Sequence, residues 1–218
     1  MVMFLAALSG VAWTVVYADC IRIGFRQRTY AMPVAALALN FAWETVYAAH
    51  GLLTPRSLQT WINVVWALAD AAIVVTFLRF GRAEFPGFLR PAWFAGGAAA
   101  LFAVAYAVQA LFVHQFGWHD GAAYSAFLQN LLMSVLFVAM FLARGGCRGQ
   151  SRLVATAKWL GTLAPTVAFG VLDHSGFVLG IGLLCCVVDL AYLALLQWAG
   201  SHPDLFGGTA TGRQSASA

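Results

Sequence analysis

Only 9% of the 218 residues are charged, whereas 62% are hydrophobic. Soluble domains carry about 25% charged residues, so this composition excludes a soluble globular protein and predicts an integral membrane protein. The formal net charge of +4 says little as a total, because the distribution of charge along the chain is the informative property. Eleven of the twelve basic residues are arginine in a chain rich in alanine and glycine, which is typical of a GC-rich bacterial gene and indicates a bacterial plasma membrane.

Seven apolar runs are long enough to form helices that cross a bilayer. In chain order they lie at 3–18, 32–53, 61–78, 92–113, 122–143, 155–172 and 176–198. Prolines and glycines separate them, and Pro165 falls inside the sixth run, where we expect a kink. We therefore predict an all-α, polytopic membrane bundle of about seven transmembrane helices. Residues 1–199 are expected to form its single domain, and residues 200–218 a disordered cytoplasmic tail.

Basic residues alternate between the loops. The first, third and fifth loops each have three arginines, whereas the second has only Arg56 and the fourth and sixth have no Lys or Arg. Because cytoplasmic loops are enriched in Lys and Arg, this pattern predicts a multi-pass protein with its N-terminus outside and its C-terminus in the cytoplasm. That orientation requires an odd number of helices, which agrees with seven.

Three acidic residues lie inside the predicted helices, each on a face with aromatic or amide side chains, because spacings of three, four and seven residues share a helix face. The three sets are Asn40, Trp43, Glu44 and Tyr47; Asn63, Trp66 and Asp70; and Asp189, Tyr192 and Leu196. A rise of 1.5 Å per residue puts Glu44 roughly 18 Å from the cytoplasmic end of its helix, Asp70 roughly 13 Å from the outer end and Asp189 roughly 20 Å from the outer face. We expect the three acids to line one cavity.

The alternative is that each acid only makes a hydrogen bond between helices. Three acids at similar depth without a neutralising Lys or Arg argue against it, and Asp70 fits a structural role best. Asp19 beside Arg22 is interpreted as an interfacial charge. The fourth loop, with His114, His119 and Asp120, is expected to be a solvated turn, and interfacial anchors are expected at Trp13, Trp93, Trp118 and Trp198.

Such a cavity suits acid-initiated chemistry on an apolar substrate. Two carboxyl groups close together in a low dielectric cannot both be charged cheaply, so at least one of Glu44 and Asp189 is expected to be a protonated general acid. Aromatic faces stabilise a developing cation, and exclusion of water protects it.

Several other classes can be weighed against the residues present. A retinal protein needs a lysine in its last helix, and the only lysine is Lys158; the Asp-Asp-x-x-Asp cluster of ionisation-type terpene synthases does not occur in the sequence. A small proton-coupled transporter is the main alternative, since buried acids also serve as proton relays. A helical scaffold subunit, in which neutral replacement of all three acids would be tolerated, is a third alternative.

Six segments carry a resemblance to a known family. They are NFAWETVY at 40–47, WALAD at 66–70, LRFG at 78–81 with EFP at 84–86, RGQS at 148–151, KWLGT at 158–162 and DLAYL at 189–193. In this order the segments resemble the small membrane-bound terpene cyclases of fungal meroterpenoid pathways. They are also similar to the bacterial relatives that cyclise farnesyl groups on indole scaffolds, as in drimentine-type pathways.

The resemblance implies a function and a site. The substrate would be a polyprenyl chain, such as farnesyl, on an indole or other aromatic head, and protonation of its terminal alkene or epoxide would start ring closure through carbocations. Matching motif to motif places the catalytic acids at Glu44 and Asp189. We expect one of them to donate the proton while hydrogen-bonded to the other. The residues expected to orient this pair or bind substrate are Asn40, Trp43, Tyr47, Trp66, Asp70 and Tyr192. No metal, cofactor or nucleic acid is expected, and the sequence leaves the oligomeric state open.

Overall fold

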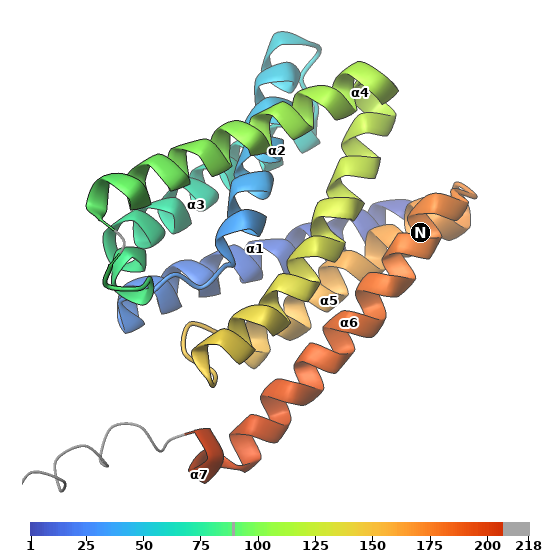
Figure 1. The fold of residues 1–218 in the computed structure, drawn as a ribbon. Helices are drawn as coiled ribbons and strands as arrows, with labels where there is room; N and C mark the ends of the chain where they lie inside the picture. The colour runs from blue at the N-terminus through green and yellow to red at the C-terminus, as the bar shows by residue number, and fades with distance from the viewer. Residues whose placement is uncertain (89, 207–218) are drawn as a thin grey trace, which may run out of the picture.

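The computed structural model describes residues 1–88 and 90–206. All regular structure in these residues is helical (Figure 1). The elements are α1 Val2–Gln27, α2 Val34–Leu53, α3 Leu58–Phe80, the 3₁₀ helix η1 Gly81–Glu84, α4 Pro91–Arg144, α5 Arg152–Pro165, the π-helical segment η2 Thr166–Leu172, α6 Gly176–Ser201 and α7 Pro203–Phe206. Four helical segments of the described residues are long and apolar enough to cross a membrane: α1, Leu58–Glu84, α4 and α6. The all-α class and the membrane character predicted from composition are confirmed.

Helix α4 is longer than expected because it contains two of the predicted helices. Both 92–113 and 122–143 fall within it, and the chain reverses at Gly117, which has φ 76° and ψ −179°. Only glycine adopts such a backbone at low cost, so a single residue makes the bend visible in Figure 1. The predicted fourth loop is therefore shorter than expected, since His114, His119 and Asp120 are helical, but all three are exposed, as a solvated turn predicts.

The helix type changes at Pro165, where the sequence predicts a kink. Helix α5 ends at this residue, and the chain continues as η2. Proline has no backbone N–H, so the carbonyl of Gly161, four residues earlier, receives no helical hydrogen bond from it. The Ser9 hydroxyl of α1 donates to that carbonyl at 2.8 Å instead, which joins α1 to α5 one turn before Pro165.

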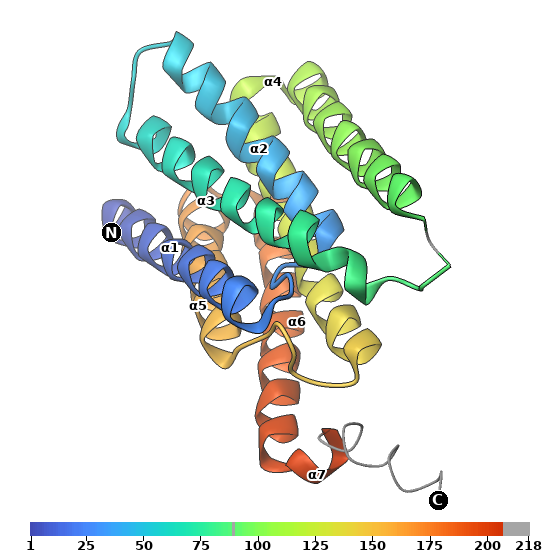
Figure 2. The ribbon, with the colours of Figure 1, turned by 90° about the vertical axis from the view of Figure 1, so that its left-hand side faces the viewer.

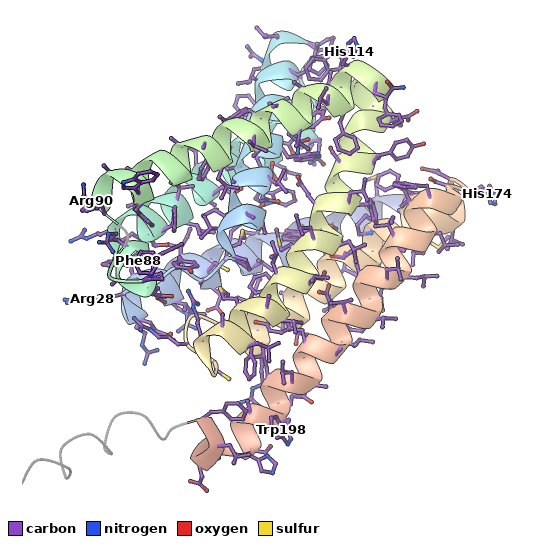
Figure 3. All side chains as sticks on the ribbon, viewed as in Figure 1. Arg28, Phe88, Arg90, His114, His174 and Trp198 are labelled. Carbon is purple, nitrogen blue, oxygen red and sulfur yellow. The ribbon has the colours of Figure 1, made fainter. Side chains whose placement is uncertain are left out.

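The first, third and fifth loops meet at one end of the bundle. Arg144 forms an ion pair with Glu84 at 2.7 Å and donates to the carbonyl of Tyr30 at 3.0 Å, while the Thr29 hydroxyl donates to Glu84. Figure 3 shows Arg28 and Arg90 at this end and His174 at the opposite end. The loops with three arginines each therefore share one end, as the charge pattern predicted.

Each of the helices α1 to α6 packs mainly against two of the others. Helix α1 packs against α3 and α5, α2 against α3 and α4, and α6 against α4 and α5. Figure 2 shows the first half of α4 beside α2, on the far side of the bundle from α6. The start of the predicted tail is helical and not disordered, because α6 continues through Ser201 and α7 spans Pro203–Phe206. The rest of the predicted tail, 207–218, lies outside the described residues.

Candidate active site

A cavity of about 490 Å³ lies between α1, α2, α3, the second half of α4, α5 and η2. We call it the main cavity; its volume is in the range of sites that hold a small organic ligand. Large aromatic side chains dominate its wall, among them Trp13, Tyr17, Trp43, Trp66, Trp118 and Phe127. An apolar chain therefore fits it better than a charged ligand does.

The main cavity runs from one end of the bundle into its interior. Val2 and His119 line its outer part, at the end where the N-terminus lies (Figure 1). Tyr17 and Asn40 line its inner part, since Tyr17 is 15 residues after Val2 and therefore roughly 22 Å further along α1. A long ligand can thus lie along the axis of the cavity.

Glu44 is the one acidic residue among the described residues that line the main cavity. Its side chain is buried, and the Tyr17 hydroxyl donates to its Oε1 at 3.3 Å. Its Oε2 is buried without a hydrogen-bond partner in the described part of the chain. A charged carboxylate with an unpaired oxygen is costly in apolar surroundings, so this geometry favours a neutral carboxylic acid with its proton on Oε2.

Asn40 links this acid to Asp70. The Nδ2 of Asn40 donates both to the Tyr17 hydroxyl, at 2.6 Å, and to Oδ2 of Asp70, at 2.8 Å. Asp70 is fully buried behind Asn40 and does not line the main cavity. The sequence predicted that Asn40 and Asp70 orient a Glu44–Asp189 pair, whereas the structure connects them to Glu44 alone, through the Tyr17 hydroxyl. No motif in the sequence selects Tyr17.

Asp189 lies in a separate polar cluster. The Nζ of Lys158 donates to its two carboxylate oxygens at 2.8 and 2.9 Å and to the Ser134 hydroxyl at 2.6 Å. Two expectations are therefore wrong: a basic residue does neutralise one of the three acids, and Glu44 and Asp189 each have a different hydrogen-bond partner. Asp189 does not line the main cavity either, so the three acids do not share it.

The Lys158 cluster lies directly behind the cavity wall. Asn130 and Thr162 both line the main cavity, and Nδ2 of Asn130 donates to the Thr162 hydroxyl at 2.6 Å. Thr162 in turn donates to the carbonyl of Lys158 at 2.9 Å, and Ser134 donates to the carbonyl of Asn130 at 2.9 Å. The ion pair is thus one layer removed from any ligand in the cavity.

The predicted aromatic residues are divided among three places. Trp43 and Trp66 line the main cavity. Tyr47 lines a smaller cavity next to it. Tyr192 lies outside both, in the core, where its hydroxyl donates to Gln150 at 2.6 Å.

Two of the tryptophans expected to be interfacial anchors also belong to the wall of the main cavity. Trp13 and Trp118 both line it, because Trp13 packs against Gly161 of α5 and Trp118 directly follows the bend at Gly117. Position near the end of a predicted helix was the only signal available for them, and it does not distinguish an anchor from a cavity residue.

Comparison with known proteins agrees with the resemblance seen in the motifs. The family described as Pyr4-like transmembrane terpene cyclases matches residues 1–172, a range that contains Glu44 and Lys158 but not Asp189. The chain is similar to the terpene cyclase pyr4 of Aspergillus fumigatus, with 27% identity over 204 residues, covering 86% of this chain and 82% of that protein. No solved structure matches.

Two further fungal relatives show the same likeness over a shorter range. The terpene cyclase dpchB of Colletotrichum higginsianum is 32% identical over 162 residues, and the terpene cyclase dpmpB of Macrophomina phaseolina is 31% identical over 167 residues. Both matches cover 72% of this chain and 64% of the relative. The aligned part of this chain therefore spans less than two thirds of the length of these relatives.

Proposed function

This chain belongs to the family of Pyr4-like transmembrane terpene cyclases, and from that premise we propose that it cyclises a farnesyl or other polyprenyl chain attached to an indole or related aromatic scaffold. Glu44 would be the acid that starts the reaction. The observation that carries the proposal is the buried, unpartnered Oε2 of Glu44 in the wall of an aromatic cavity.

The proposed chemistry needs only a proton donor and a shaped cavity. With an alkene, the Glu44 proton adds to a carbon of the terminal double bond, an inner double bond attacks the resulting cation to close a ring, and loss of a proton elsewhere gives an isomer of the substrate. With an epoxide, the proton goes to the oxygen, the C–O bond breaks as the ring forms, and the oxygen stays on the product as a hydroxyl. Loss of a proton from carbon then discharges the remaining cation, so this product is also an isomer of its substrate. In both cases a general acid is required.

The wall of the main cavity supports this chemistry. The faces of Trp43 and Trp66 can stabilise positive charge that develops on the chain. The aromatic lining also excludes water, which would otherwise capture the cation early. The Tyr17 hydroxyl holds Glu44 and can stabilise the carboxylate left after proton transfer.

Asp189 receives a different role in this proposal from the one the motifs implied. Because its carboxylate is paired with Lys158, we assign proton donation to Glu44 and make Asp189 a positioning residue. It neutralises Lys158, which with Ser134 and Thr162 supports the Asn130 side of the cavity wall.

The orientation in the membrane is also part of the proposal. The end that gathers Arg28 and Arg90 (Figure 3) would face the cytoplasm of a multi-pass protein in the plasma membrane. The mouth of the main cavity would then lie at the outer end of the bundle.

The test is incubation of enriched membranes that contain the full chain with 3-farnesylindole and with its terminal epoxide, followed by chromatography and mass spectrometry. We expect a cyclic product of unchanged mass from one of the two, in leaky as well as sealed membranes. A proton-coupled transporter would instead give uptake that requires sealed vesicles and a pH gradient. Unchanged substrate in both incubations would contradict the proposed substrate class.

A further inference from the structure

A second cavity of about 250 Å³ adjoins the main cavity; we call it the side cavity. It lies between the end of α2, the connection 54–57 and the start of α3, and Figure 2 shows this connection at the end of the bundle away from the α3–α4 connection. The two cavities share Trp43, Gln59 and Ala122 in their walls. They therefore form two compartments of one site.

The side cavity is more polar than the main one. Tyr47, His50, Ser57, Thr60 and Asn63 line it, whereas aromatic and aliphatic groups dominate the main cavity. Tyr47 is 8% exposed, and its buried hydroxyl makes no hydrogen bond of normal geometry in the described part of the chain, although the Ser125 hydroxyl of α4 lies near it. Since a buried polar group without a partner is costly, this hydroxyl points to a ligand that carries a hydrogen-bonding group.

Three rings line the side cavity, those of Trp43, Tyr47 and His50, and each packs against another aromatic ring. The His50 ring stacks on Trp118 with centroids 3.7 Å apart and planes 2° from parallel, and Tyr47 packs on Trp43 with centroids 4.7 Å apart. Aromatic side chains favour another ring in stacked or edge-to-face contact. The chemistry of the side cavity therefore fits an aromatic ring with an N–H or O–H group.

Trp43 marks the boundary between the compartments. Its Nε1 donates to the carbonyl of Ala122 at 3.1 Å, which fixes the indole where the two cavities meet. Glu44 lies on the main-cavity side, and His50 of the side cavity follows it by six residues, or roughly 9 Å along α2. A prenyl chain that starts near Tyr47 can thus reach the acid in a folded conformation.

We propose that the side cavity binds the aromatic head group of the prenylated substrate, which fixes its direction: the head lies against Tyr47 and Asn63, and the far end of the chain reaches Glu44. This inference rests on the proposed function, because it assumes a substrate with a head and a chain. It adds a binding site for a heteroaromatic ring. It also adds a direction of binding, with the head group on the side-cavity side of Trp43 and the chain on the main-cavity side.

The test uses two photoreactive forms of 3-farnesylindole, one with a diazirine on the indole ring and one with a diazirine at the far end of the chain. The full chain is labelled in membranes, digested and analysed by mass spectrometry. We expect the ring probe to label residues within 47–63 and the chain probe to label the segments around Tyr17, Glu44 or Met133. Excess 3-farnesylindole should suppress both labels.

The ring probe decides the outcome. Absence of competable ring labelling within 47–63, or ring labelling near Tyr17 and Met133, overturns the inference whatever the chain probe does. The measurement depends on binding and not on turnover, so it can be repeated on Glu44→Gln. If the unsubstituted protein binds 3-farnesylindole in this direction but forms no product, the proposed function is refuted and the inference about binding stands.

A pair of variants adds a second readout. Tyr47→Phe removes the free hydroxyl and should weaken binding of 3-farnesylindole about three- to tenfold while leaving the binding of farnesol unchanged. Tyr106→Phe is the matched control, because Tyr106 lines neither cavity and its hydroxyl bonds to Thr45. Equal loss of affinity for both ligands in Tyr47→Phe would contradict a role in head-group binding.

Discussion

Lys158 and Asp189 form an ion pair at 2.8 Å in which each side chain is only 1% exposed. The two residues come from α5 and α6, and the Ser134 hydroxyl of α4 completes the cluster. This pairing separates the acids of the bundle by role. Asp189 is paired with a cation. Among the described residues Glu44 and Asp70 each have a buried carboxylate oxygen without a hydrogen-bond partner, but only Glu44 lines the main cavity.

Removing one member of this ion pair should destabilise the protein. Asp189→Asn leaves the Lys158 ammonium group buried and without a counter-charge, which costs about 3–5 kcal/mol. We expect less folded protein in membranes and a lower midpoint of thermal unfolding in detergent. The double variant Lys158→Met, Asp189→Asn removes both charges and should recover most of the stability.

Turnover of the double variant tests whether Asp189 positions the cavity wall or takes part in proton donation. If Asp189 is a positioning residue, the double variant should also recover much of its turnover per folded protein. A double variant that folds normally yet forms no product would show that Asp189 takes part in proton donation.

Tyr17→Phe should slow catalysis without unfolding the protein. The change removes the hydrogen bond to Glu44 and one partner of Asn40, and a loss of about 1.4 kcal/mol of transition-state stabilisation corresponds to about a tenfold lower kcat. KM should change little, because the ring stays in the wall. Tyr192→Phe is the control, since its hydroxyl bonds to Gln150 outside both cavities; an equal fall in its kcat per folded protein would contradict the role given to Tyr17.

Two glycines of α6 should respond differently to the same substitution. A Cβ at Gly182 would overlap with the side chain of Thr166 in η2, whereas a Cβ at Gly180 would meet no atom within 4 Å. Gly182→Ala should therefore cost about 1–3 kcal/mol through overpacking, and Gly180→Ala should leave the unfolding midpoint unchanged or raise it. Equal midpoints for the two variants would mean that α6 does not pack closely on η2.

Cys147 offers a test of the proposed orientation. It is exposed in the connection between α4 and α5, at the end that gathers the arginine-rich loops. A membrane-impermeant maleimide should label it in inverted vesicles and not in intact cells, and Cys147→Ser should abolish the label. Labelling in intact cells would reverse the orientation.

The labelling of Cys147 should also depend on pH. Burial around its sulfur raises the pKa of the Cys147 thiol above its ordinary value, and the opposing effect of Arg152 is smaller. Because the thiolate is the reactive form, a raised pKa leaves less of it at neutral pH. The labelling rate should therefore still be rising at about pH 9; a rate that levels off near neutral pH would contradict this.

The sequence predicted properties that depend on one helix or one loop at a time. Apolar runs, the glycine at 117 and the proline at 165 gave the helices and their interruptions, and the arginines gave the two ends of the bundle. Helical spacing also placed Asn40, Trp43 and Glu44 on one face. These features are local, so no knowledge of how the helices pack was needed.

Contacts between helices could not be read in the same way. Tyr17 precedes Glu44 by 27 residues, and Lys158 precedes Asp189 by 31, so their pairing depends on which faces meet in the folded bundle. Lys158 did give a signal, because a lysine inside a predicted membrane helix is costly unless an acid neutralises it. Tyr17 gave none, since nothing near it in the sequence marks that turn of α1 as functional.

The most direct measurement is the initial rate of cyclisation by Glu44→Gln in membranes with matched amounts of folded protein. The glutamine keeps an acceptor for the Tyr17 hydroxyl but has no acidic proton, so we predict a rate at least about 100-fold below that of the unsubstituted protein. Asp120→Asn, which changes an exposed acid at the bend of α4, should stay within about twofold. A Glu44→Gln rate as high as that of Asp120→Asn would contradict the assignment of Glu44 as the proton donor.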